Sequence, residues 1–561
     1  MSPSHHRHSR PLAIATAATR ACTIAIFLQV LSKPSTASAA ASTNNDDNDS
    51  CLIYLAESTI PGAGLGMFAG TPFHQGQLIG RNYGDAAFPT TDQDWHNSFP
   101  KMNSKHSGDY HWPLIDYEWN APGTGMEHIA EDVSVTVTGL GAAANCHFRL
   151  FNVKEHPASY DNMGLDRYTD PGAGGSTPWF NRTSLALRDI QAGSELFVNY
   201  GLLWFLTRNG VFELVPVTSS YEHAQAFLGE YGKMLVGSND VEDLVEENMQ
   251  LGDEVQKDLW DIIKSFPYPS REREALPNLH KDAIRAIRGG IRKVEEENAI
   301  RDVEYLKEHG KCVDNIVPGK STIEHAGRGA FATRFMPKGG LVAPAPVVHI
   351  ADKSTTYMYT KMIGPSGDIV RNVTDILTKQ IILNYCFGHP NSTLLLFPYS
   401  SNVAYINHHL TEYNAKLRWA TDFSFFHHED WLDKSVEFLE DQWTSGLALE
   451  FIATRDIQPG EEVLINYGQD WQDAWDEHVK NWLPVKNWLP VEWFKNMEYT
   501  PDMFLRHAFR HVKNWLPVEW FKNVEYTPDV FLKHAFRHEM RIPDELFPKA
   551  WMNLIPKDEK D

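Results

Sequence analysis

Apolar residues recur at helical spacing between about residues 218 and 310, a stretch without glycine-rich turns. They fall into three groups: Val241, Leu244, Val245 and Met249; Val255, Leu259, Ile262 and Ile263; and Ala283, Ile284, Ala286, Ile287 and Ile291. Spacings of three and four place such side chains on one face of a helix. We therefore expect two to four helices within a connector at residues 206–311. These helices either position a substrate or form an ordinary packed link.

The segments on either side of this connector repeat one another. Residues 58–69 (STIPGAGLGMFA) return at 321–332 (STIEHAGRGAFA), and residues 188–201 (RDIQAGSELFVNYG) return at 455–468 (RDIQPGEEVLINYG). Between them, Asn145-Cys146-His147 corresponds to Asn407-His408-His409. Because the three segments keep their order and almost their spacing, the sequence predicts two copies of one module. We place the first module at residues 51–205 and the second module at residues 312–475.

These segments resemble the landmarks of the SET domain, the fold of most protein-lysine methyltransferases. The family shows an early Gly-x-Gly, a central Asn-His-Ser-Cys-x-Pro-Asn and a late Gly-Glu-Glu-Leu-x-x-x-Tyr-Gly. Both modules carry the first and third landmarks. The central one is altered: the second module keeps Asn407-His408 and a later Asn414 without the Cys or Pro, and in the first module His147 is displaced by one position. The resemblance covers a little over half of the chain.

The resemblance implies a site in the second module. Tyr467 corresponds to the family tyrosine whose hydroxyl orients the lysine amine, and Tyr200 is its counterpart in the first module. The residues at the cofactor-binding positions are Gly327, Arg328, Gly329, Asn407 and His408. The second module is preferred because its Asn and His are adjacent, as in the family. The alternatives are a tight turn for the glycines and a packed strand-end aromatic for the tyrosine.

The implied activity is protein-lysine N-methylation with S-adenosylmethionine as the cofactor and a protein lysine as the substrate. Such an in-line transfer requires aligned reactants, exclusion of water and a neutral amine, and burial lowers the pKa of lysine. The rival interpretation is a non-catalytic SET-fold binding module of the secretory pathway. It is favoured by the altered central motif and by the absence of the zinc-binding cysteine cluster that follows some SET domains.

The charge and length of the chain limit the classes of binding partner that we expect. The chain has 561 residues, a formal charge of −22 and 42% hydrophobic residues, which suits several globular domains. Nucleic-acid binding is not expected, because phosphate contacts need clustered Lys and Arg. An acidic surface fits a basic protein substrate or simple solubility.

The N-terminus is typical of a secretory signal peptide. Arginines precede an apolar run over residues 21–31, and Ala37-Ser38-Ala39 forms an Ala-x-Ala cleavage site. We assign residues 1–39 to the signal peptide and residues 40–50 to a polar linker. The mature chain is then luminal or secreted and has no membrane segment, although an uncleaved signal anchor is the alternative.

Cysteines are few for a secreted chain. After the signal peptide they are Cys51, Cys146, Cys312 and Cys386, none spaced as Cys-x-x-Cys. They allow two disulfides in three pairings or remain free thiols.

The tail at residues 476–561 carries a second repeat. Residues 486–512 return almost unchanged at 513–539. Thr500-Pro501-Asp502 and Thr527-Pro528-Asp529 each resemble a helix N-cap followed by proline, so we expect a tryptophan-rich helical tail. The pairs His507 with His511 and His534 with His538 have a spacing that can chelate a metal. Half-buried histidines on an amphipathic helix are the favoured interpretation, so no metal site is predicted. Altogether the sequence predicts an α+β protein of short strands, with a helical connector and a helical tail.

Overall fold

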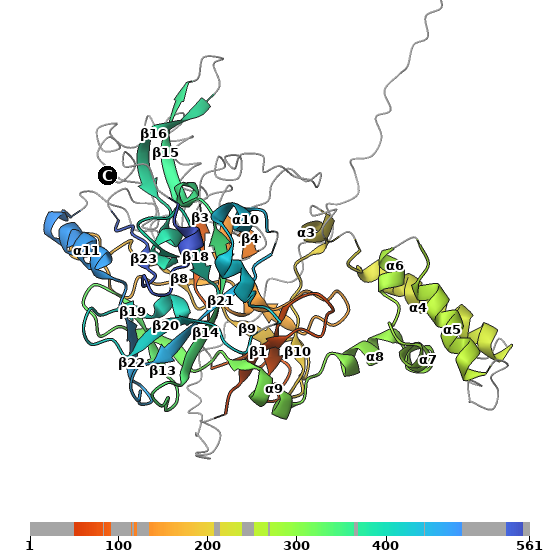
Figure 1. The fold of residues 1–561 in the computed structure, drawn as a ribbon. Coiled ribbons are helices and arrows are strands. Elements are labelled where there is room, and N and C mark those ends of the chain that lie inside the picture. The colour runs from red at the N-terminus through yellow and green to blue at the C-terminus, as the bar shows by residue number, and fades with distance from the viewer. Residues whose placement is uncertain are drawn as a thin grey trace, which may run out of the picture. The chain divides into compact units, whose positions relative to one another are not determined.

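The computed structural model describes residues 50–81, 84–90, 114, 117–120, 134–206, 212, 214–237, 252–267, 270–363, 369–423, 425–442, 444–484 and 535–553. Helices and many short strands are mixed along this part of the chain, as expected of an α+β protein (Figure 1). Among the described residues, no helix is both long and apolar enough to cross a membrane. The predicted signal peptide and most of the predicted tail repeat lie outside the described residues.

A four-stranded antiparallel sheet contains the first and third motif segments of the first module. Its order is β10 (Glu195–Leu196), β2 (Leu65–Ala69), β1 (Ile53–Glu57) and β11 (Lys311–Cys312). Every residue of β2 is buried, because β2 is a central strand with packed layers on both faces. The last strand, β11, comes from the start of the second module.

A second four-stranded sheet gathers all three motif segments of the second module. Its order is β12 (Ile316–Lys320), β13 (Arg328–Ala332), β22 (Glu462–Ile465) and β19 (Asn407–His408). The pairing of β13 with β22 is antiparallel and that of β19 with β22 is parallel. Segments separated by more than a hundred residues along the chain therefore become neighbours.

The largest sheet has six strands and supplies much of the hydrophobic core. Its order is β20 (Ala415–Trp419), β21 (Leu447–Ala453), β14 (Leu341–Ile350), β18 (Leu395–Pro398), β17 (Phe387–Gly388) and β23 (Met540–Arg541). Nine of the ten residues of β14 are buried. The edge strand β23 belongs to the tail and pairs in parallel with β17.

The remaining strands form small sheets. These are β3 (Ala87–Thr90), β5 (Ser134–Val137) and β4 (Glu118–Asn120); β6 (Val153–Glu155) and β9 (Ser184–Ala186); β7 (Ser159–Tyr160) and β8 (Trp179–Phe180); and β15 (Tyr357–Ile363) and β16 (Ile369–Lys379). Short helices outside the connector are α2 (Leu140–Ala143), α3 (Leu202–Leu206) and α10 (Val436–Glu440).

The connector is helical, but it contains more helices than the two to four predicted. The described part has α4 (Thr218–Val236), α5 (Asp253–Lys264), α6 (Arg271–Glu274), α7 (His280–Gly289), α8 (Ile291–Asn298) and α9 (Val303–His309). Gly290, with φ of 85°, separates α7 from α8 where apolar spacing suggested one helix. Helices α4, α5, α7 and α8 share a hydrophobic core around Leu228, Trp260 and Ile291, which favours the packed-link interpretation.

In the described part of the tail, residues 476–481 form the end of an α-helix, Lys549–Trp551 form one short turn, and the other residues are not helical. That α-helix, α11 (Gln469–Asn481), continues directly from the third motif segment. His538 was expected on a helix, and this expectation is wrong: it precedes β23 in an extended segment, where its backbone N–H donates to Asn384. The reason is tertiary, since strand pairing with β17 replaces the local helical preference. His507, His511 and His534 lie outside the described residues.

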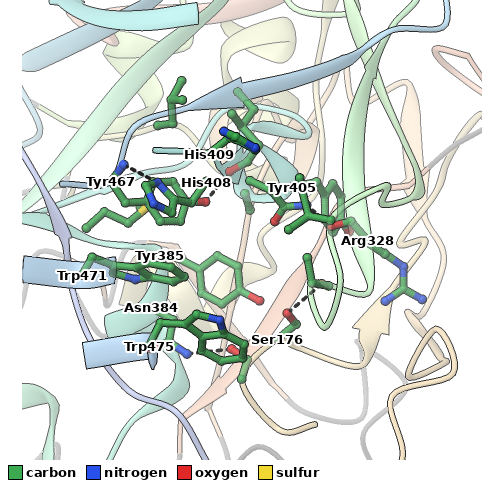
Figure 2. Close-up of a pocket in the computed structure, with 18 of the residues that line it drawn as sticks. Ser176, Arg328, Asn384, Tyr385, Tyr405, His408, His409, Tyr467, Trp471 and Trp475 are labelled. Atoms are coloured by element: carbon green, nitrogen blue, oxygen red, sulfur yellow. Dashed lines mark hydrogen bonds between the residues drawn. The ribbon is translucent and has the colours of Figure 1, made fainter. Parts of the chain in front are cut away.

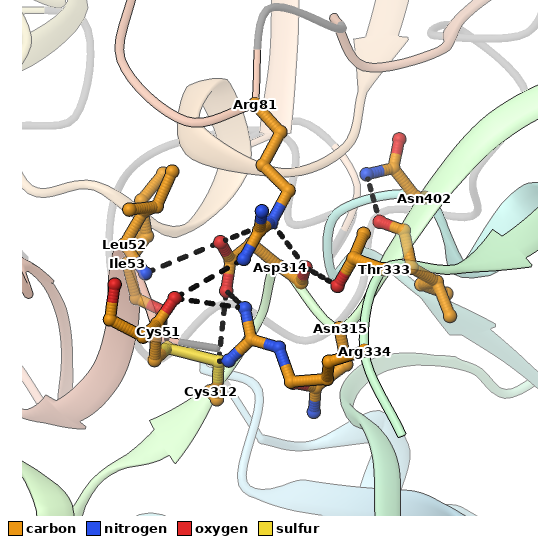
Figure 3. A network of polar contacts seen from close by, with 12 residues as sticks. Cys51, Leu52, Ile53, Arg81, Cys312, Asp314, Asn315, Thr333, Arg334 and Asn402 are labelled. Carbon is orange, nitrogen blue, oxygen red and sulfur yellow. Dashed lines mark hydrogen bonds and ion pairs between the residues drawn. A yellow bond between two sulfur atoms is a disulfide. The ribbon is translucent and has the colours of Figure 1, made fainter. Parts of the chain in front are cut away.

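One disulfide resolves the alternatives left by the cysteine pattern. Cys51 pairs with Cys312, while Cys146 and Cys386 are buried free thiols. Beside the disulfide, the Asp314 carboxylate lies 3.0 Å from Arg81 Nε and 3.1 Å from Arg334 Nη2 (Figure 3). Burial raises the pKa of Asp314, and the two arginines oppose this shift. The disulfide and Asp314 join the start of the first module to the start of the second.

Candidate active site

A buried glutamate in the second module is hydrogen-bonded to residues of the other two motif segments. The Glu462 carboxylate accepts hydrogen bonds from Ser321 Oγ and the Thr322 backbone N–H, both at 2.7 Å. Asn407 Nδ2 donates to the same carboxylate at 3.2 Å, to Ser321 Oγ at 3.0 Å and to the Arg328 carbonyl at 2.7 Å. Several donors on one carboxylate make a strong buried network.

The same network recurs in the first module. Glu195 accepts from Ser58 Oγ and the Thr59 N–H at 2.7 Å, and Asn145 Nδ2 donates to Glu195 at 3.2 Å. Burial raises the pKa of Glu195, opposed by these hydrogen bonds. Sequence reasoning did not assign a role to either glutamate. The available signal was a Ser-Thr pair before each Gly-x-Gly together with a glutamate at the same place in both third segments.

The glycines of the Gly-x-Gly segment have a local explanation. A Cβ on Gly329 would lie 2.0 Å from Glu462 Oε1, and one on Gly66 would lie 2.5 Å from Glu195 Oε1. Gly327 has φ of 73°, which favours glycine over other residues. The second glycine of the segment, Gly329, was assigned to the cofactor site, and in the structure the Glu462 carboxylate of the protein occupies the space beside it.

His408 and Tyr467 lie side by side. His408 Nδ1 accepts from the Tyr467 backbone N–H at 2.9 Å, and His408 Nε2 lies 3.0 Å from Gln472 Oε1. Since Nδ1 accepts, Nε2 carries the proton and donates to Gln472. The two rings are stacked, with centroids 5.3 Å apart, and burial lowers the pKa of His408.

In the first module a cysteine takes the place of His408. Cys146 Sγ accepts from the Tyr200 backbone N–H at 3.5 Å. His147 instead matches His409: the Nδ1 atom of each accepts two backbone N–H groups from the turn that follows. His147, the displaced histidine of the first module, therefore occupies the structural position of His409 and not that of His408.

A cavity of about 330 Å³ lies beside this pair and is here called the tyrosine cavity (Figure 2). The Tyr, Trp and Phe residues that line it are Tyr385, Phe387, Tyr405, Phe451, Tyr467, Trp471, Trp475 and Phe536. Of the predicted site residues, Arg328, Asn407, His408 and Tyr467 line it, whereas Gly327 and Gly329 do not. Its volume lies within the range of small-molecule sites.

The three tyrosine hydroxyls of the cavity differ in their partners. Tyr467 donates to the Ile406 carbonyl, and Tyr385 accepts from the Thr177 N–H at 2.7 Å. The Tyr405 hydroxyl is buried and has no hydrogen-bond partner among the described residues. Burial raises the pKa of all three. A buried hydroxyl without a partner is costly, so Tyr405 marks a place where a polar ligand atom would be stabilised.

Arg328 does not direct its charge into the cavity. Its guanidinium lies 3.1 Å from Asp161 Oδ2 and covers the Phe180 ring, both in the first module. In Figure 2 the guanidinium points away from the tyrosines. Burial lowers its pKa, opposed by neighbours that include Tyr405 and Asp161. Its predicted contact with a cofactor is therefore limited to the backbone and the aliphatic stem.

Comparison with known proteins gives a family match within the second module. Residues 327–468 match the SET domain model. The match assigns the SET domain to this segment, which is about a quarter of the 561-residue chain. The matched range begins in the Gly-x-Gly segment and ends just after Tyr467, so this SET domain contains every predicted site residue. No curated protein matches the chain.

Parts of the chain also match solved structures. A Plasmodium falciparum protein described as a candidate histone methyltransferase is 18% identical, with a TM-score of 0.17, over 28% of this chain and 96% of that one. CpSET8 from Cryptosporidium is 15% identical, with a TM-score of 0.15, over 45% and 98%. The Polycomb Repressive Complex 2 of Chaetomium thermophilum bound to S-adenosylmethionine is 14% identical, with a TM-score of 0.17, over 44% and 33%. The chain thus spans about a third of that Polycomb chain.

Proposed function

We propose that the SET domain of the second module is a protein-lysine N-methyltransferase that uses S-adenosylmethionine. The observation that supports the proposal is the tyrosine cavity, where Tyr467 of the third motif segment meets Asn407 and His408 of the central one. The unpartnered Tyr405 hydroxyl and the aromatic lining suit a ligand with both polar and apolar parts. When bound, S-adenosylmethionine supplies an electrophilic methyl group.

The residues of the chain have definable roles in this proposal. The Tyr467 hydroxyl is held by the Ile406 carbonyl, so its oxygen keeps lone pairs that can accept a hydrogen bond from an amine. The aromatic walls exclude water and favour the neutral form of a lysine amine. An amine held in this way would present its lone pair to the methyl group that S-adenosylmethionine would supply.

A calorimetric titration with S-adenosylmethionine tests the cofactor assignment. Saturable binding to the chain without residues 1–39 supports the proposal, and no binding at millimolar ligand contradicts it. Incorporation of labelled methyl groups into a basic protein then tests the lysine assignment.

The alternative is a non-catalytic SET-fold binding module of the secretory pathway. Two observations favour it: the Asn407 amide nitrogen already donates to Ser321, Arg328 and Glu462 of the protein itself, and the Cys51–Cys312 disulfide suits an oxidising compartment. We accordingly propose a luminal or secreted location. Detection of the disulfide in chain isolated from cells, after immediate thiol blocking, tests the location.

We also infer that the first and second modules are two copies of one fold. The matching glutamate networks and the matching histidine turns support this inference. The first module has Cys146 where the second has His408, so we assign the cofactor to the second module alone.

A further inference from the structure

One wall of the tyrosine cavity comes from the other module. Residues 172–177 lie between β7 and β8 of the first module, yet Gly172, Gly175, Ser176 and Thr177 line the cavity of the second. Ser176 is labelled in Figure 2 beside Tyr385 and Trp475. We call residues 172–177 the wall segment.

The wall segment is fastened directly to the cavity residues. Thr177 N–H donates to Tyr385 Oη at 2.7 Å, and Asn384 Nδ2 donates to the Gly175 carbonyl at 2.7 Å. Asn384 also donates to the Phe536 carbonyl at 2.8 Å. One side chain therefore joins the first module, the second module and the tail at the edge of the cavity.

Charged groups flank this contact. His325 Nδ1 lies 3.2 Å from Asp170 Oδ1, and Arg328 pairs with Asp161. A Cβ on Gly172 would lie 2.0 Å from the His325 carbonyl. The backbones of the two modules thus approach so closely that only glycine fits, which indicates a fixed junction rather than a loose surface contact.

The Gly-x-Gly loop of the first module is in turn contacted by an aromatic ring of the second module. Phe426, from the second module, is buried and lies 3.6 Å from the position a Cβ would take on Gly64 in the Gly-x-Gly segment of the first module. Each module therefore contacts the glycine loop of the other, but only the second module's loop borders the tyrosine cavity.

We propose that the wall segment is a specificity-determining part of the second module's site, so that the first module completes this site without carrying out the reaction. The proposal rests on the function proposed above. According to this proposal, a ligand in the tyrosine cavity contacts the Ser176 side chain and the backbone of the residues next to Ser176. The wall also holds the Tyr385 ring through the Thr177 N–H, which makes Thr177 a positioning residue.

A size series at Ser176 tests this proposal by calorimetric titration with S-adenosylhomocysteine. Ser176→Leu and Ser176→Phe should weaken binding progressively, by about tenfold or more for Phe, because the added bulk enters the cavity. Ser176→Ala removes the hydroxyl without adding bulk and should weaken binding less than either larger residue. Ser159→Phe adds the same ring as Ser176→Phe at an exposed position of the first module and should leave affinity unchanged.

Thermal unfolding of each variant keeps the result interpretable. If Ser176→Phe does not fold, the affinity of Ser176→Leu provides the test, because the smaller leucine side chain displaces fewer neighbouring atoms. Equal affinity across the folded series, with binding by the wild type intact, would overturn the wall assignment and leave the proposed function standing. Absence of binding by the wild type would overturn the proposed function and, with it, this inference.

Discussion

Tyr467 is the side chain whose replacement separates ligand binding from chemistry. Tyr467→Phe removes the hydroxyl and its bond to the Ile406 carbonyl while keeping the ring against His408. Turnover should fall by about a hundredfold, the scale of a lost positioning group, with little change in cofactor affinity. Initial rates and calorimetry on the same preparation check this. If Tyr467→Phe turned over at the wild-type rate, Tyr467 would have a packing role and no catalytic one.

Replacement of Tyr405 by phenylalanine should affect the stability of the free protein and its affinity for a ligand in different directions. Its hydroxyl is buried without a partner among the described residues, so Tyr405→Phe should leave the free protein as stable or more stable, by up to about 1 kcal/mol. Ligand affinity should decrease. Tyr385→Phe is the matched control, because it loses the bond from the Thr177 N–H and should be less stable than the wild type. Urea unfolding and calorimetry distinguish the two.

The motif residues could be predicted from sequence, but their surroundings could not. Asn407, His408 and Tyr467, which were selected through the resemblance to the SET domain, lie together in the structure, and their roles stay a prediction. Arg328 is adjacent to them as predicted, yet its guanidinium binds the first module. Ser176 and Phe536 carry no motif and lie far away in the chain, so only the tertiary structure reveals that they line the same cavity.

At the scale of elements, the connector docks on the first module through a buried polar cluster. His147 on the first module lies 3.9 Å from Glu295 on α8 and 3.2 Å from the Tyr221 hydroxyl on α4. Burial lowers the pKa of His147 to about 4 and raises the pKa of Glu295 to about 8. Both groups are therefore mainly neutral near pH 7, and the contact is not an ion pair.

Glu295 should make stability fall as the pH rises. The folded protein keeps the Glu295 proton up to about pH 8, whereas the unfolded chain loses it near pH 4.5, so this stabilising contribution is lost between those values. Glu295→Gln stays neutral and should gain about 1–2 kcal/mol relative to the wild type between about pH 6.5 and 8. Urea unfolding at both pH values measures this difference.

The matched control for this pH dependence is Glu297→Gln, on the exposed side of the same helix. It should change with pH as the wild type does. Parallel pH curves for wild type and Glu295→Gln would mean that Glu295 is already ionised in the folded protein.

For the whole molecule, the Cys51–Cys312 disulfide should be a major source of stability. It closes a loop with a sequence separation of 261, and loops of this length correspond to about 5 kcal/mol in the chain-entropy model. The double variant Cys51→Ser, Cys312→Ser should therefore unfold at clearly lower urea concentration. Thiol counting in denaturant is the independent check: the chain without residues 1–39 should show only Cys146 and Cys386 before reduction. Four reactive thiols before reduction would contradict the pairing.

The tyrosine cavity also constrains the order in which the chain can fold. Its lining runs from Gly172 in the first module to Met540 in β23 of the tail. A ribosome releases the N-terminal part first, so an emerging chain can assemble the first module and connector long before the last wall exists. Contacts with such long sequence separation form slowly. During synthesis, the partly built cavity would expose Trp471 and Trp475, and this nascent state is the one most dependent on chaperones.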